Sequence, residues 1–67
     1  MNKNYIEYIV LFGNDRYNPD LHYAACRNKF DYIADARKYA KGYSNASIFE
    51  FHFARDSGDI LYFAEKY

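Results

Sequence analysis

Residues 47–67 read SIFEFHFARDSGDILYFAEKY and indicate the fold class of this 67-residue chain. Phe49, Phe51 and Phe53 occupy every second position, which is the spacing of side chains on one face of a β-strand. Residues 56–58, DSG, suit a three-residue hairpin loop with Gly58 in the left-handed conformation. A two-residue loop would instead place Asp56 opposite Asp59, a destabilising pair of like charges. The predicted register pairs Arg55 with Asp59, Phe53 with Leu61, Phe51 with Phe63 and Phe49 with Glu65 on one face, and Ala54 with Ile60, His52 with Tyr62, Glu50 with Ala64 and Ile48 with Lys66 on the other.

The first half of the chain contains one clear strand and one ambiguous segment. Residues 5–12, YIEYIVLF, are aromatic and β-branched without a glycine or proline, which predicts a strand. Residues 13–19, GNDRYNP, are rich in turn formers and predict a reversal of the chain. Residues 21–27, LHYAACR, fit either the start of a helix or a strand returning beside the first one. We favour the strand.

Residues 31–41, DYIADARKYAK, predict the helix. Asp31 is a suitable N-cap, and Gly42 can supply a left-handed stop. At 100° per residue, one side of this helix carries the expected buried stripe of Tyr32, Ile33, Ala36, Tyr39, Ala40 and Tyr43. Arg37, Lys38 and Lys41 lie on the opposite side.

These elements predict a single α+β domain over residues 1–67, with a four-stranded antiparallel sheet and one helix on one face (ββαββ). We expect the helix to cover a wall formed by Ile6, Tyr8, Val10, Phe12, Phe49, Phe51, Phe53, Leu61 and Phe63. Phe51 is then a core ring. No second helix is expected, so the other face should stay uncovered, with Tyr5, Glu7, Ile9, Leu11, Ile48, Glu50, His52, Ile60, Tyr62 and Ala64 on it. An uncovered face with so many apolar groups favours an interaction site. The alternative is that its polar residues allow the face to be exposed to solvent without a partner.

The overall composition restricts the classes of function. Nine basic and nine acidic residues give no net charge, so binding of nucleic acid through bulk charge is not indicated. No apolar run approaches the ~18 residues of a membrane span, and the first residues lack a signal-peptide pattern. A single cysteine, Cys26, cannot form a disulfide within the chain and suits a reducing compartment. We therefore expect a cytoplasmic protein.

Few residues could support catalysis. On a strand, His22 and Cys26 would share a face but lie ~13 Å apart, which is too far for proton transfer. Two histidines and one cysteine do not complete a tetrahedral metal site with recognisable spacing. We expect no enzymatic activity, no metal and no cofactor.

The candidate partner-binding residues form two groups. Tyr5, Glu7, Glu50, His52 and Tyr62 are expected on the uncovered face of the sheet. Arg37, Lys38 and Lys41 form a basic strip on the helix, which Arg27 and Lys29 would extend toward phosphates or an acidic protein. The alternatives to a protein partner are a small nucleic-acid-binding module and a homodimer that pairs its open sheet faces.

The helix D-Y-I-A-D-A-R-K-Y-A-K-G is followed by S-I-F-E-F-H-F, a turn and D-I-L-Y-F-A-E-K. Together with YIEYIVLF and LHYAACR, this order resembles small phage-encoded proteins, including some type I-F anti-CRISPR proteins, which share the A-[RK]-[RK]-x-A helix and the final hairpin. Such proteins often carry a basic tail with tryptophan, and this chain has no tryptophan. The resemblance implies a non-enzymatic inhibitor that covers a surface of a host nucleic-acid-handling complex, with a CRISPR effector as the suspected partner in the host cytoplasm. It assigns no interface residue.

Overall fold

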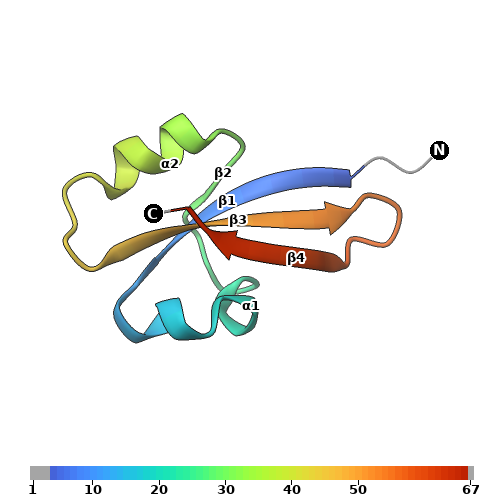
Figure 1. Cartoon of the computed structure of the whole chain (residues 1–67), viewed down its shortest axis with the longest axis horizontal. Coiled ribbons are helices and arrows are strands. Elements are labelled where there is room, and N and C mark those ends of the chain that lie inside the picture. Colours follow the sequence, from blue (N-terminus) through green and yellow to red (C-terminus); the bar gives the residue numbers. More distant parts are fainter. Residues whose placement is uncertain (1–3, 67) are drawn as a thin grey trace.

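Four strands form one antiparallel sheet in the order β2-β1-β3-β4 in this computed structural model, which describes residues 4–66 (Figure 1). The strands are β1 (Asn4–Phe12), β2 (Lys29–Phe30), β3 (Ala46–Ala54) and β4 (Ile60–Glu65). The two long strands, β1 and β3, pair along their whole length. The predicted α+β class with a four-stranded antiparallel sheet is confirmed, and so is the first strand.

The prediction of a strand over residues 21–27 is wrong. After a 3-10 helix, η1 (Gly13–Tyr17), the chain forms a short helix, α1 (Pro19–His22), and turns at residues 23–25. Pro19 occupies the first turn of α1, where its fixed φ suits a helix and its missing N–H costs nothing. The strand beside β1 is instead β2, only two residues long.

Both faces of the sheet are covered, which corrects the prediction of one helix over a single wall. In the pairing of β1 with β3, Ile9 lies opposite Phe49 and Val10 opposite Ile48. The three phenylalanines of β3 therefore share a face with Ile9, and not with Val10 as predicted. The physical reason is that β1 carries apolar side chains on both faces: Ile9, Val10 and Leu11 are all buried.

Each face has its own core and its own cover, seen on either side of the sheet in Figure 1. The segment around α1 covers one face, where Tyr23 and Cys26 pack on the core of Ile9, Leu11, Phe49, Phe51 and Phe53. Helix α2 (Ile33–Ala40) covers the other face, where Ala36 packs with Val10 and Ile48. Phe51 is completely buried, as predicted.

Helix α2 is shorter than predicted at both ends. Its N-cap is Tyr32 and not Asp31, and no side chain accepts a capping hydrogen bond there. Its C-cap, Lys41, keeps a right-handed conformation, and Tyr43 N–H bonds Ala40 O at 3.0 Å in a simple turn. Gly42 therefore does not adopt the predicted left-handed stop, because this turn needs no positive φ. Ala36 is buried and Ala40 half-buried as expected, but Tyr32 is 69% exposed, so the predicted stripe is too wide.

The final hairpin has the predicted pairs over most of its length. Its predicted end at Tyr67 lies outside the described residues. The observed pairs are Phe49 with Glu65, Glu50 with Ala64, Phe51 with Phe63 and His52 with Tyr62. Gly58 has a φ of 76°, as the loop chemistry required. Next to the loop the prediction is wrong, because a bulge pairs Phe53 with Ile60 and leaves Arg55 and Asp59 outside the ladder.

Candidate functional site

Helix α2 covers only half of its face of the sheet, and the other half is the candidate site. The candidate site consists of two rows that cross strands β1, β3 and β4. We call it the open patch, and it comprises Ile6, His52 and Tyr62 in one row and Tyr8, Glu50 and Ala64 in the next. The row farther from α2 is exposed at Ile6 and Tyr62, whereas in the nearer row Tyr8 packs against the core under α2. The rows beyond it, starting with Val10 and Ile48, lie under α2.

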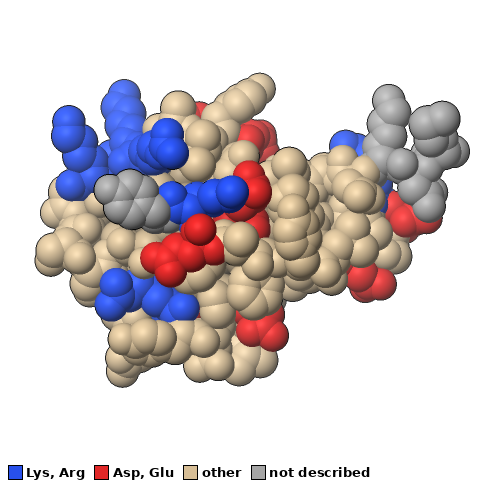
Figure 2. Space-filling model, in the orientation of Figure 1, with Lys and Arg blue, Asp and Glu red and all other residues tan. Residues whose placement is uncertain are grey.

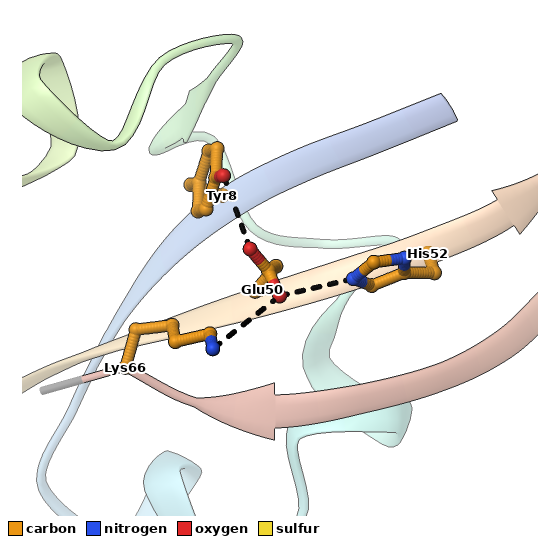
Figure 3. Close-up of polar contacts among 4 residues, drawn as sticks. All are labelled: Tyr8, Glu50, His52 and Lys66. Carbon is orange, nitrogen blue, oxygen red and sulfur yellow. Dashed lines mark hydrogen bonds and ion pairs between the residues drawn. The ribbon is translucent and has the colours of Figure 1, made fainter. Parts of the chain in front are cut away.

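The carboxylate of Glu50 is the centre of a polar network in this patch (Figure 3). Tyr8 OH donates a hydrogen bond to Oε2 at 3.1 Å. His52 Nε2 lies 3.0 Å from Oε1, and Lys66 Nζ lies 3.6 Å from the same oxygen. Because an ionised carboxylate can only accept, His52 uses Nε2 as the donor. Two strands and the residue after a third thus surround the charge of Glu50: β1 holds Tyr8, β3 holds Glu50 and His52, and Lys66 directly follows β4.

The network shifts the pKa values of two of its members. The hydrogen bond from His52 holds the pKa of Glu50 below its ordinary value of 4.5, and Tyr8 and the charge of Lys66 act in the same direction against the effect of burial. The pKa of Tyr8 is raised from 10.0 by burial and by its bond to Glu50. Glu50 is therefore a stable anion and Tyr8 a stable neutral donor near neutral pH.

Two exposed side chains border this network. Tyr62 is 53% exposed, and its ring centroid lies 4.3 Å from that of His52. Ile6, opposite His52 across the β1–β3 pair, is 40% exposed. The patch therefore combines apolar surface with an anion whose geometry is set before any partner arrives.

The structure brings together only three of the five candidate partner-binding residues that were expected on the uncovered face. Glu50, His52 and Tyr62 are in the open patch, whereas Tyr5 and Glu7 lie on the opposite face. Tyr5 stacks on Phe53 with ring centroids 4.9 Å apart, and Glu7 accepts a hydrogen bond from Tyr23 OH. The error follows from the pairing of β1 with β3, which places Tyr5 opposite Phe53 and Glu7 opposite Phe51. Ile9, Leu11 and Ile48, also expected on an uncovered face, are buried.

Sequence reasoning missed three residues of this site. Ile6 and Tyr8 were expected in the core wall, and Lys66 was not selected at all. A usable signal was the continuous apolar run over residues 9–12, since such a run is typical of a strand buried on both faces. It indicates that both faces of β1 are covered. With that signal, Ile6 and Tyr8 could have been assigned to the face opposite the three phenylalanines.

The basic strip on α2 is exposed as expected, at Arg37, Lys38 and Lys41. Figure 2 shows Lys and Arg side chains gathered at the end of the molecule that carries α2. Lys29 does not extend this strip. Its ammonium group lies 4.1 Å from the ring centroid of Tyr23, which belongs to the cover of the opposite face.

His22 is the last residue of α1, and Cys26 follows the turn after it. Both line a pocket of about 360 Å³ beside β1, together with Asp15, whose Oδ1 is 3.5 Å from His22 Nε2. Cys26 is half-buried, its Sγ contacts Val10 O at 3.6 Å, and it packs against the phenylalanine core as a small side chain. Within residues 4–66, no group of three or more His, Cys, Asp or Glu side chains is arranged to hold a metal ion.

No protein-family model, curated protein or solved structure matches this chain. Among the described residues, no helix has both the length and the apolar character that crossing a membrane requires.

Proposed function

We propose that this protein is a binding module that recognises a protein partner through the open patch, without catalysing a reaction. The observation that carries the proposal is the half-exposed ring of Tyr62, which packs at a tilt against His52 beside the half-buried polar network of Glu50. Rings in such positions supply much of the energy of protein interfaces, because they offer large contact area at a low cost in side-chain entropy.

The network around Glu50 would favour binding by preorganisation. Its donors Tyr8 and His52 already hold the carboxylate, so no long charged side chain has to be ordered when a partner arrives. Ile6 and Tyr62 supply the apolar contact on either side of His52. A partner surface with an apolar centre and a donor directed at Glu50 would complement this arrangement.

The more specific proposal is a phage-type inhibitor that covers a surface of a host nucleic-acid-handling complex in the host cytoplasm, with a type I-F CRISPR effector as the suspected partner. Its support is the sequence resemblance described above. The single free thiol of Cys26 is compatible with a reducing compartment.

A second candidate function is nucleic-acid binding by the strip Arg37, Lys38 and Lys41. It is favoured by the exposure of all three side chains. Figure 2 shows Lys and Arg side chains gathered at the end of the molecule that carries α2. The zero net charge argues against a dominant role for it. Affinity for single-stranded DNA that falls steeply as the salt concentration rises would support this function in place of the first.

The test of the open patch compares two exposed tyrosines. A photo-crosslinking amino acid replaces Tyr62 in one variant and Tyr32, 69% exposed on the α2 side, in the control. Each variant is mixed with purified type I-F effector complex and with lysate of the bacterium that carries it. We expect one defined crosslinked protein at position 62 and none at position 32, and we expect Tyr62→Ala to weaken binding by about tenfold or more.

The outcomes separate the two levels of the proposal. Crosslinking of another host protein at position 62, with the effector still able to bind DNA, would refute the CRISPR partner and keep the binding module. Equal crosslinking at positions 62 and 32, or no effect of Tyr62→Ala on binding, would refute the open patch as the contact surface.

A further inference from the structure

The outer edge of β4 is the longest unpaired strand edge in the described part of the chain. β4 pairs with β3 on one side, and no strand among residues 4–66 lies on its other side (Figure 1). All six residues from Ile60 to Glu65 are exposed. Sheet edges are usually protected by charged side chains, proline, a bulge or a very short strand. The opposite edge, β2, is protected by its length of two residues, whereas β4 contains no lysine or proline and has only the bulge beside Ile60 and the charge of Glu65, at its two ends.

The hydrogen bonds to β3 determine which backbone groups of β4 remain available. Lys66 N–H bonds Ile48 O at 2.6 Å, and in an antiparallel pair such bonded positions recur at every second residue. Lys66, Ala64 and Tyr62 therefore direct their N–H and C=O groups toward β3. Phe63 and Glu65 direct theirs outward, as does Leu61 beside the bulge.

We propose that two copies of this chain pair along β4 in antiparallel orientation, with Phe63 at the two-fold axis. A two-fold axis perpendicular to the sheet leaves the same face of both copies on the same side. Each residue of β4 therefore pairs with a residue of the second copy whose side chain lies on the same face. Centring on Phe63 bonds the outward groups of Phe63 to those of its own copy. It also bonds Leu61 to Glu65 of the second copy, and therefore uses every outward backbone group of the strand.

The side chains favour this register over its neighbours. Centring on Tyr62 would place Asp59 opposite Glu65 of the second copy, a repulsive pair that occurs twice by symmetry. Centring on Ala64 would place Phe63 opposite Glu65 and lose the central ring pair. Centring on Phe63 joins two rings at the axis, brings Lys66 opposite Ile60, and opposes no like charges.

The pairing would also cover apolar surface that the single chain leaves in water. Phe63 is 37% exposed although its ring stacks on Phe51 with centroids 5.0 Å apart. Leu61 is 51% exposed. Pairing of one short strand buries less than a standard interface, so we expect a weak dimer that forms with rising concentration. Because the faces stay aligned, the two open patches would lie side by side on one eight-stranded sheet and offer a partner two equivalent contact surfaces.

The test uses sedimentation velocity over about 1 µM to about 1 mM protein. Leu61 is replaced by Glu in one variant and by Lys in another, because this exposed position meets Glu65 of the second copy only in the register centred on Phe63. We expect the wild type to dimerise, Leu61→Glu to weaken the dimer by about tenfold, and Leu61→Lys to leave it as tight or tighter. Far-UV circular dichroism checks that both variants remain folded.

Three results would overturn the proposal. A wild-type chain that stays monomeric at the highest concentration excludes the dimer. A dimer that Leu61→Glu leaves unchanged forms through another surface. Equal weakening by Glu and Lys excludes this register, since it shows that Leu61 does not face the carboxylate.

Discussion

Tyr23 tests the second cover of the sheet most directly. It lies in the turn after α1, and its ring centroid is 5.2 Å from that of Phe51 and 5.0 Å from that of Phe53. If the α1 segment closes this face, truncation of Tyr23 exposes both phenylalanines. If the face were instead covered by α2, as the sequence pattern predicted, Tyr23 would not be needed to cover these two rings.

The contacts give the size of the expected effect. Truncation of a fully buried ring costs about 3–5 kcal/mol, and because Tyr23 is only half-buried we expect about 2–4 kcal/mol for Tyr23→Ala. Tyr23→Phe keeps both ring contacts and loses only the hydrogen bond to Glu7, which should cost about 1 kcal/mol. A chain of 67 residues has a total stability of about 3–10 kcal/mol, so the first substitution removes a large part of it.

The assay is urea unfolding followed by circular dichroism, with Tyr32→Ala as the matched control. We expect the free energy of unfolding to decrease in the order wild type, Tyr23→Phe, Tyr23→Ala, and to change by less than about 0.5 kcal/mol for Tyr32→Ala. Equal, small effects of Tyr23→Ala and Tyr32→Ala would refute the cover of the phenylalanine face by the α1 segment.

Two further substitutions probe the site and the hairpin. The pKa of Glu50 is lowered from 4.5, so its network stabilises the folded chain above that pH and loses this contribution as the pH falls through the folded-state pKa. The difference in unfolding free energy between wild type and Glu50→Gln should therefore be largest above pH 4.5 and shrink as the pH falls below it. A difference that stays constant with pH would contradict the role of the carboxylate charge. Gly58 has a φ of 76°, so Gly58→Ala should destabilise the hairpin by about 1 kcal/mol although nothing lies within 4 Å of the added Cβ, and an unchanged urea midpoint would refute the strain.

The amino-acid sequence by itself determined the first strand, the centre of helix α2 and four pairs within the final hairpin. Alternation in residues 47–54 and the DSG loop were sufficient for the pairs of Phe51 with Phe63 and His52 with Tyr62, because a short loop limits the possible registers. The first strand and the central part of the helix could be predicted equally well from the sequence. Their signals, β-branched residues and the spacing of Ala36 and Ala40, depend only on residues a few positions apart.

Only the tertiary structure decided which faces of β1 and β3 coincide. More than thirty residues separate the two strands along the chain, and β1 is apolar on both sides, so its pattern satisfies either pairing. The choice placed Tyr5 and Glu7 under the α1 segment and left Ile6 and Tyr8 beside Glu50. Residues 21–27 likewise have weak local preferences. They form a helix and a turn because the phenylalanine face needs a cover, and the burial of those rings outweighs the small differences in backbone propensity.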